Sequence, residues 1–271
     1  MEIGNKNISK VWDKVLVARS ANRINGENIL HNVFDSFYEL HGDRLYGDDK
    51  SIISGLALLD NYPVSVIVQN KKNTSETHYG MPFPEGYRKT LRIMEQANKF
   101  GRPIINVIDT PGAYPGIEAE KRGQAEAIAR NLYAMANMSV PIISIIIGEG
   151  GSGGALALSL ANKIYMLENA IFSVVSPEGC ASILWKSKEK APLAAYYLKL
   201  TAIDLFKLGI IDGIIDESKD LENVYRKIKT VIKKNLLEYE NMEKKLIQED
   251  RRNKYRKIGQ IVMEENWNEN F

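Results

Sequence analysis

The stretch VPIISIIIGEGGSGGALALSLANKIYML (residues 140–167) decides the fold of this chain. Its apolar, β-branched run from Pro141 to Ile147 is typical of a strand that is buried on both faces, as in a parallel sheet. Glycines follow from Gly148 to Gly154, and good helix formers continue to Ala161. The stretch therefore predicts a strand that turns through glycines into a helix, whose first N–H groups can bind an anion or a developing oxyanion.

One function that fits this geometry is dinucleotide binding. Gly148, Gly150 and Gly153 have the spacing of the dinucleotide fingerprint, and Glu168 follows the next predicted strand, where a ribose-binding acid belongs. The helix between them is short for a βαβ unit, which weakens this interpretation without excluding it. A P-loop is excluded, because no Lys-Ser or Lys-Thr follows the last glycine.

The same glycines also fit two kinds of acyl-transfer site. Gly150-x-Ser152-x-Gly154 matches a nucleophile elbow, but all three histidines precede the serine, whereas hydrolases of that fold place the histidine after it. The alternative is an oxyanion hole formed by the N–H groups of Gly150 and Gly151, which needs no catalytic side chain. A turn that only packs a helix on a strand remains a further interpretation.

Composition narrows the class of protein. The 271 residues are 44% hydrophobic and 26% charged, which is enough for one large domain or two small ones, and the net charge of +2 favours neither nucleic acid nor membrane as a partner. The single cysteine, Cys180, excludes a disulfide framework and a thiolate zinc site made by this chain alone. Neither a signal peptide nor an apolar run of about 20 residues is present, so we expect a cytoplasmic protein.

A second glycine turn, Asp109 to Gly116, follows another predicted buried strand at 104–108. Two strand, turn and helix units in succession predict that both turns lie at one edge of a parallel sheet, where ligands bind in such folds. Ser176 and Pro177 have the pattern of a helix start. Glu178 in that first turn is a candidate acid or base, although an acid there more often complements the helix dipole.

The remaining elements follow from periodicity and from glycine and proline signals. We expect Leu91, Met94, Ala97 and Phe100 to form the buried side of the helix at 84–100, and the basic cluster Arg251-Arg252-x-Lys254 to lie on the surface. The expected elements are helices at 9–23, 28–40, 118–138, 190–208 and 220–261, strands at 51–59, 63–69, 163–167, 171–175 and 210–215, an exposed loop at 70–84, and a frayed end at 264–271.

Long sequence motifs give a more specific prediction. In order, they are HGDRLYGDDK (41–50), GMPFPEGYRK (80–89), IDTPGAYPG (108–116), RGQAEAIARNL (122–132), IGEGGSGGALAL (147–158) and SPEGCASILWKS (176–187). With these motifs the chain resembles the carboxyltransferase alpha subunits of bacterial acetyl-CoA carboxylase. The resemblance covers most of residues 32–216.

The resemblance implies an α/β fold, namely a crotonase-like spiral of β-β-α units with flanking N- and C-terminal helices. It divides the chain into an N-terminal helical segment (1–31), a crotonase-like carboxyltransferase domain (32–216), and a C-terminal amphipathic helix with its tail (217–271). It also implies a beta subunit of the same fold that carries a zinc ribbon, in an α2β2 heterotetramer. The implied reaction transfers a carboxyl group from carboxybiotin, held on the biotin carboxyl carrier protein, to acetyl-CoA, and the malonyl-CoA product serves fatty-acid synthesis.

In this family carboxybiotin releases carbon dioxide, and the ureido anion of biotin then removes the α-proton of the acetyl thioester, so the cofactor is itself the base. The protein stabilises the two oxyanions with backbone N–H groups. The resemblance assigns the ureido oxygen to Gly150 and Gly151 of this chain, and implies no metal and no ATP site in it. The residues expected to bind carboxybiotin or substrate are Gly112, Ala113, Tyr114, Ser152 and Gly153.

Four other interpretations remain open at the level of sequence. In the first, the chain would be a divergent carboxyltransferase paralogue that acts on another acyl-CoA. In the second, it would be a crotonase-type enoyl-CoA hydratase or isomerase that uses Glu118 and Glu178 as an acid/base pair. The third and fourth come from different functional classes: a dinucleotide-binding module, and an interaction scaffold without chemistry of its own.

Overall fold

The computed structural model describes residues 5–218 and 220–260 of the chain. At its centre lie strands β4 (Ile104–Thr110) and β5 (Ile142–Gly151), which pair in parallel. Every residue of β4 and all but the last residue of β5 are buried, which confirms the prediction of strands covered on both faces. Strand β5 is longer than predicted, because its glycines continue the ladder to Gly151 instead of leaving it at Gly148.

A single eight-stranded sheet forms the body, with strand order β1-β2-β3-β4-β5-β6-β8. The first three strands pair antiparallel, and the pairs from β3 onward are parallel. The short strand β7 pairs with the glycine-rich end of β5 rather than with the main path. The other strands are β1 (Ser36–Glu39), β2 (Ile52–Leu59), β3 (Tyr62–Gln69), β6 (Lys163–Leu167), β7 (Ile171–Ser173) and β8 (Gly213–Ile215).

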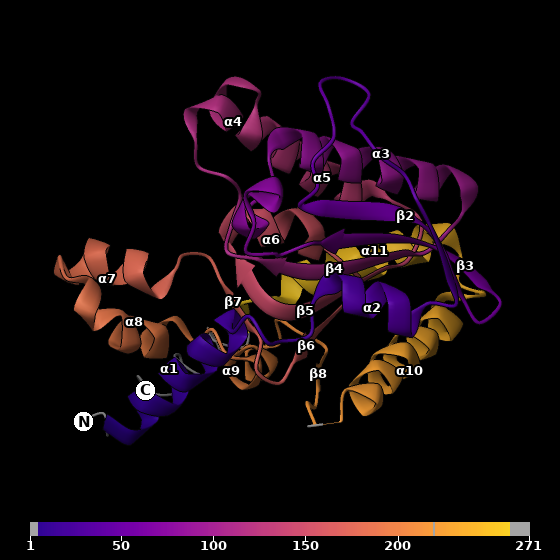
Figure 1. Cartoon of the computed structure of the whole chain (residues 1–271). Coiled ribbons are helices and arrows are strands. Elements are labelled where there is room, and N and C mark those ends of the chain that lie inside the picture. Colours follow the sequence, from indigo (N-terminus) through magenta and orange to yellow (C-terminus); the bar gives the residue numbers. More distant parts are fainter. Residues whose placement is uncertain (1–4, 219, 261–271) are drawn as a thin grey trace.

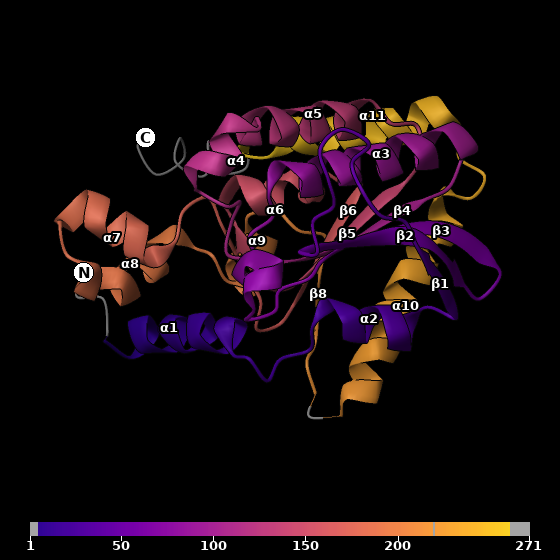
Figure 2. The same cartoon turned by 45° about the horizontal axis from the view of Figure 1, so that its top comes forward.

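Helices cover both faces of this sheet (Figures 1 and 2). On one face lie α3 (Pro84–Phe100), α5 (Gln124–Asn137), α6 (Ser152–Ser159) and α11 (Lys244–Lys257), and on the other lie α2 (Gly26–Val33) and α10 (Leu221–Tyr239). Near the edge where β5 passes into α6, Figure 1 shows α7 (Pro177–Trp185) and α8 (Ala191–Leu198) projecting from the body beside α1 (Asn5–Arg19). The shorter elements are η1 (Ser75–Gly80), α4 (Ile117–Lys121), η2 (Lys188–Lys190) and α9 (Ala202–Lys207).

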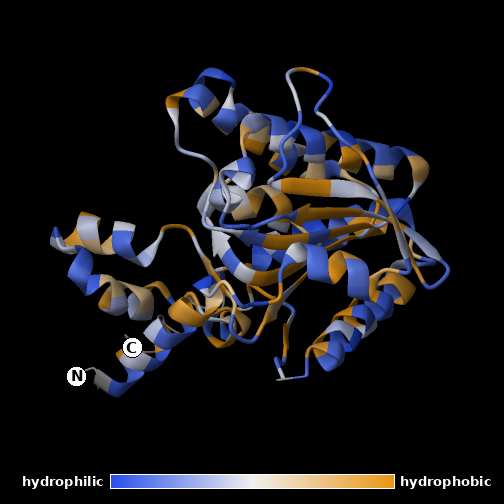
Figure 3. Cartoon of the chain, viewed as in Figure 1, coloured by the Kyte–Doolittle hydropathy of each residue, from blue (hydrophilic) through white to orange (hydrophobic). Residues whose placement is uncertain are grey.

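Several predicted helix ends are confirmed with their physical causes. The helix α3 begins with Pro84 and ends at Gly101, which takes a left-handed φ of +71°. At the start of α7 the Ser176 side chain accepts a hydrogen bond from the Gly179 N–H, as its N-cap position predicts. Figure 3 shows the hydrophobic colouring concentrated in the strands, so the core lies between the sheet and its two helical layers.

Three predicted helices differ from those of the structure. The helix expected at 118–138 is two helices, α4 and α5, because Gly123 takes a φ of +81° between them. The helix expected at 190–208 is likewise divided, into α8 and α9, by Lys199 with a φ of +51°. The helix expected at 28–40 ends at Val33, and its second half is instead strand β1 at the edge of the sheet.

Burial corrects two further expectations, and a fourth predicted helix also differs. Phe100 does not belong to the buried side of α3, since it is 60% exposed at the last turn. The loop at 70–84 is not fully exposed, because Thr77 and Gly80 in η1 are buried. The helix expected at 220–261 is two helices, α10 and α11, and residues 261 and 264–271 lie outside the described part of the chain.

The largest correction concerns Arg251, which was expected on the surface with Arg252 and Lys254 and is fully buried instead. Its guanidinium donates to the backbone carbonyls of residues 135, 138 and 140 and to the side-chain oxygen of Asn162. Burial lowers the pKa of Arg251 to about 10. The C-terminal helix α11 is therefore anchored to the end of α5 and to the start of β5.

Within residues 5–218 and 220–260, no helix combines the length and the apolar character that crossing a membrane requires. The expected boundary after residue 31 falls inside α2.

Candidate functional site

The two predicted glycine turns meet at one edge of the sheet. A Cβ atom on Gly151 would lie 2.1 Å from the carbonyl oxygen of Pro111, and one on Gly154 would lie 2.5 Å from the amide nitrogen of Ala113. These distances are much shorter than any side chain permits, so both positions need glycine for the backbones to touch. The prediction that the turns after β4 and β5 lie together is confirmed.

The turn after β4 is held by the Thr110 hydroxyl group. This hydroxyl accepts a hydrogen bond from the Gly112 N–H at 3.1 Å and donates to the Gly80 carbonyl at 2.6 Å. Gly112 takes a φ of +148°, a conformation that side chains rarely adopt. Thr110 thus fixes the turn after β4 to the end of η1.

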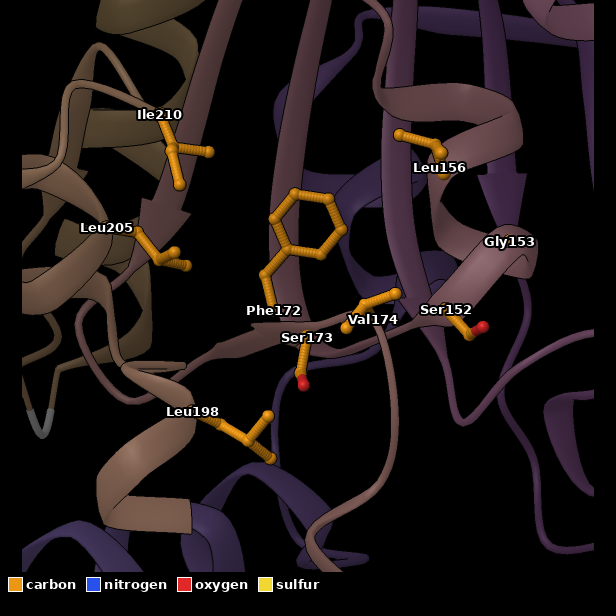
Figure 4. A pocket seen from close by; sticks show the side chains of 9 residues that line it. All are labelled: Ser152, Gly153, Leu156, Phe172, Ser173, Val174, Leu198, Leu205 and Ile210. Atoms are coloured by element: carbon orange, nitrogen blue, oxygen red, sulfur yellow. The ribbon is translucent and has the colours of Figure 1, made fainter. Parts of the chain in front are cut away.

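Beside these turns lies an apolar cavity of about 280 Å³. In Figure 4 the Phe172 ring stands in the middle of the lining, with Leu205 and Ile210 on one side of it and Leu156 and Gly153 on the other. The full lining is Ser152, Gly153, Leu156, Phe172, Ser173, Val174, Leu198, Leu205 and Ile210. Two of the predicted binding residues, Ser152 and Gly153, therefore face this cavity.

Helix α6 begins at the wall of the cavity. Its N-cap residue, Gly151, supplies no side-chain hydrogen bond, so the N–H groups of the first turn have no capping side chain. Ser152 is exposed and takes a φ of +50°, which strains a residue with a side chain. A strained strand-to-helix turn with uncapped N–H groups is an arrangement that stabilises negative charge on a ligand.

The other predicted site residues are placed differently. Gly150 and Gly151 are the last two residues of β5 and pair with Phe172 and Ser173 of β7. Gly112, Ala113 and Tyr114 belong to the touching turn but not to the lining of the cavity. Their roles remain predictions.

The Tyr114 side chain joins an aromatic cluster. Its ring stacks on Phe83 with 4.3 Å between the ring centroids, and His78 packs edge-on against the same Phe83 ring at 4.3 Å. The Tyr114 N–H donates to the Pro82 carbonyl at 3.1 Å. The segment from η1 to α3 therefore supports the turn after β4 from its outer side.

Sequence reasoning missed a charged network directly behind the glycines. Arg19 at the end of α1 donates to Glu149 at 2.7 Å and to Glu178 at 2.7 and 3.2 Å. Lys71 donates to Glu149 at 3.0 Å and lies 3.5 Å from Asp109. The only signal of this network in the sequence is the position of two of its acids. Asp109 directly follows the apolar run at 104–108, and Glu149 lies between the glycines after the next apolar run.

Asp109 also explains a glycine of the motif. Its carboxylate accepts a hydrogen bond from the Glu149 N–H at 2.8 Å, and a Cβ atom on Gly148 would lie 2.5 Å from the same oxygen. Burial raises the pKa of Asp109, against the opposing effects of the Lys71 charge and the Glu149 N–H. The ends of β4 and β5 are thus linked by a buried carboxylate as well as by their touching turns.

The acid/base pair of the hydratase interpretation is not assembled. Glu118 lies on α4 with its side chain 68% exposed, near Lys121, whereas Glu178 lies on α7 and is bound by Arg19. Burial acts to raise the pKa of Glu178, but its hydrogen bonds, above all the one from Arg19, outweigh burial and lower that pKa. Neither carboxylate lines the cavity, so the structure does not favour a hydratase.

The acid of the dinucleotide interpretation also has other partners. Glu168 lies 3.4 Å from the Lys14 ammonium group and accepts from the Glu217 N–H at 3.5 Å. Among the residues that the structure describes, no group of three or more His, Cys, Asp or Glu side chains is arranged to hold a metal ion.

Comparison with known proteins identifies the relatives of this chain. The family model described as acetyl co-enzyme A carboxylase carboxyltransferase-like matches residues 5–259. The chain is 53% identical over 257 residues to the acetyl-coenzyme A carboxylase carboxyl transferase subunit alpha of Listeria monocytogenes serotype 4a, covering 92% of this chain and 81% of the relative. It is 52% identical over 261 residues to the subunit of the same name from Bacillus cytotoxicus, covering 93% of this chain and 81% of the relative.

Solved structures support the fold. The chain is similar to transcarboxylase 12S with a TM-score of 0.70 and 17% identity, over 85% of this chain and 44% of that one. It is also similar to the beta subunit of geranyl-CoA carboxylase from P. aeruginosa, with a TM-score of 0.64 and 17% identity, over 83% of this chain and 44% of that one. These likenesses confirm the predicted crotonase-like α/β fold, and the close relatives show that this chain belongs to the family of carboxyltransferase alpha subunits of acetyl-CoA carboxylase.

Proposed function

We propose that this chain supplies one half of a composite carboxyltransferase site, the half that stabilises the ureido oxygen of biotin during carboxyl transfer to acetyl-CoA. The observation that carries the proposal is the apolar cavity at the uncapped start of α6, where the turns after β4 and β5 touch. The lining offers backbone N–H groups and hydroxyl groups, and within residues 5–218 and 220–260 it pairs no nucleophile with a base. This donor set suits a reaction whose base comes with the cofactor.

The residues present fit a biotin ring. The cavity walls are mostly aliphatic or aromatic, as the bicyclic ring requires, and the hydroxyl groups of Ser152 and Ser173 stand among them. Bound carboxybiotin supplies both the carboxyl group and, after its release, the base for the thioester. Gly150 and Gly151, with the first N–H groups of α6, would hold the ureido oxygen.

The task of this chain in that reaction is to keep its N–H groups fixed and shielded from water. Backbone donors that are already oriented need no reorganisation when negative charge develops on the ligand. Arg19 and Glu149 hold the segment before the glycines, and Thr110 holds the facing turn. Gly112, Ala113 and Tyr114 would act through this contact between the turns, since they belong to the facing turn and not to the lining of the cavity.

The thioester half of the site belongs to the beta subunit, which also carries the zinc ribbon. Large apolar side chains stand exposed in the lining of the cavity and on α7, with Val174 at 78%, Ile183 at 66% and Leu184 at 61% exposure. Large exposed apolar side chains of this kind are typical of a subunit interface. We therefore place the beta subunit over β7 and α7, in an α2β2 assembly that receives the biotin carboxyl carrier protein and acetyl-CoA.

The reverse reaction tests this function. Decarboxylation of malonyl-CoA in the presence of biocytin is measured with this chain alone, with its beta subunit alone, and with both together. Activity only in the mixture is the expected result, because each subunit provides one oxyanion hole. A stable complex that shows no activity with malonyl-CoA but turns over methylmalonyl-CoA would instead identify a paralogue for another acyl group, and no turnover of either substrate would contradict the proposal.

A further inference from the structure

A second cavity, of about 450 Å³, lies between α3 and α5 beneath the loop that joins β1 to β2. It shares no lining residue with the cavity at α6. Five arginines and three acids are in its lining, so positive charge predominates. The charged lining residues are Arg44, Arg88, Arg92, Arg122, Arg130, Asp43, Glu95 and Glu126.

Three of these arginines already have carboxylate partners. Arg88 donates to Asp43 at 2.7 Å, Arg122 donates to Glu85 at 3.0 and 3.2 Å, and Arg130 donates to Glu126. Such pairs neutralise most of the charge that these three side chains bring to the groove.

The other two arginines share a neutral acceptor. Arg44 donates to the carbonyl oxygen of His41 at 2.9 Å, and Arg92 donates to the same oxygen at 3.0 Å and to the Gly42 carbonyl at 3.0 Å. Within residues 5–218 and 220–260, neither guanidinium forms an ion pair with a carboxylate. Two like charges thus meet at one carbonyl oxygen.

The cost of this arrangement is visible in two properties. Burial lowers the pKa of Arg92, and the charge of Arg44 lowers it further, against the opposing charges of Asp48 and Asp43. Arg44 itself takes a left-handed φ of +66°, which is unfavourable for a residue with a side chain.

The loop is built to keep Arg44 in this position. The buried Asp43 carboxylate accepts hydrogen bonds from the N–H groups of Leu45, Tyr46 and Gly47 at 2.8–2.9 Å, in addition to the one from Arg88. Arginine presents a planar fork of donors that matches the oxygens of a phosphate group. The loop holds the Arg44 guanidinium beside that of Arg92, and neither is paired with a carboxylate of the described residues. Two such groups side by side can bind an anion.

We propose that Arg44 and Arg92 form a binding site for an oligophosphate group in the groove between α3 and α5. The ligand is either a free oligophosphate or the pyrophosphate portion of a coenzyme A molecule. Both present adjacent anionic oxygens that two neighbouring guanidinium groups can bind together.

Titration calorimetry tests this site on the complex of the full chain with its beta subunit, with inorganic pyrophosphate as the probe. The variants Arg44→Gln and Arg92→Gln are each expected to weaken binding about tenfold or more, since each removes charge-assisted hydrogen bonds. The matched control is Arg130→Gln, which removes the same charge from the same groove at an exposed position that already has a partner. Its affinity is expected to stay within about twofold of the wild type.

The outcomes separate the proposal from its alternatives. The absence of saturable pyrophosphate binding would overturn the site. Equal losses of affinity in all three variants would also overturn it, because they would indicate general charge attraction. Arg92→Lys, which keeps the charge but loses the fork, is expected to bind more weakly than the wild type and serves if Arg92→Gln is poorly folded. Competition by coenzyme A, with losses in the same variants, would identify the coenzyme as the source, whereas no competition would identify a free oligophosphate. Because binding is measured without turnover, failure here is independent of the carboxyltransferase assay.

Discussion

The contact between the two glycine turns makes a sharp prediction for Gly151→Ala. The added Cβ atom would lie 2.1 Å from the Pro111 carbonyl oxygen and 2.3 Å from its carbon, whereas ordinary van der Waals contact lies at 3.4–4 Å. Because both neighbours are backbone atoms, the turns must separate by roughly 1 Å. Such a displacement of an oxyanion hole lowers kcat about 100-fold or more. Forcing a methyl group into this contact also costs about 1–3 kcal/mol of folding stability.

The matched comparison is Gly153→Ala in the same motif. A Cβ atom there meets only the Ile128 methyl groups at 3.9 Å, which is ordinary contact, so the turns stay together. We expect Gly153→Ala to keep at least about a tenth of the wild-type kcat, since its methyl group affects only the cavity wall.

The assay is decarboxylation of malonyl-CoA with biocytin in the complex, together with thermal unfolding of each variant. The expected order of kcat is wild type, then Gly153→Ala, then Gly151→Ala by a wide margin. If Gly151→Ala is folded, assembles with the beta subunit and keeps kcat within about tenfold of the wild type, the touching turns do not position the oxyanion hole. The reasoning from backbone contact would then be refuted.

Three further predictions concern side chains that support the site and the fold. Arg19→Gln is expected to lower kcat by a larger factor than it raises KM and to cost about 2 kcal/mol of stability, because Glu178 loses its Arg19 donor and Glu149 keeps only Lys71. Lys14→Gln on the same helix is expected to cost less than about 1 kcal/mol, and steady-state kinetics and urea unfolding measure both variants. Arg251→Leu is expected to lower the free energy of unfolding by about 2–4 kcal/mol, because it leaves buried carbonyl groups unpaired. Arg252→Leu is expected to change it by no more than about 0.5 kcal/mol, and calorimetric unfolding measures both variants. The hydrogen bonds of Asp43 lower its pKa despite the opposing effect of burial. The ionised carboxylate therefore contributes stability at pH values above its unfolded pKa near 3.8, and this contribution is lost as pH falls through the folded pKa. In urea unfolding, the stability difference between wild type and Asp43→Asn should narrow between pH 7 and pH 3.

Local patterns made most of the fold predictable. Residues 140–167 place a buried strand, a glycine turn and a helix in order, and each depends only on neighbours along the chain. The second turn at 109–116 was predictable for the same reason. What failed were interruptions inside helical patterns, at Gly123 and Lys199, because a single left-handed residue leaves the hydrophobic period almost unchanged.

The supporting charges could not be predicted because their partners are far away in sequence. Arg19 and Glu149 are 130 residues apart, and Arg251 contacts carbonyls more than 110 residues before it. In the sequence Arg251 belongs to a run of alternating charges, and nothing local distinguishes it from the exposed Arg252. Only the arrangement of α11 against α5 and β5 decides which of the two is buried.

The glycine motif itself shows why spacing alone left the function open. In a dinucleotide site such glycines let the backbone approach a pyrophosphate. In this chain Gly148 makes room for the Asp109 carboxylate, and Gly151 and Gly154 make room for the turn after β4. The same spacing therefore arises from contact with the neighbouring strand and turn rather than with a ligand, and α6 begins at the wall of a separate cavity. The contact partner of each glycine, rather than the spacing, is what argues against a nucleotide site here.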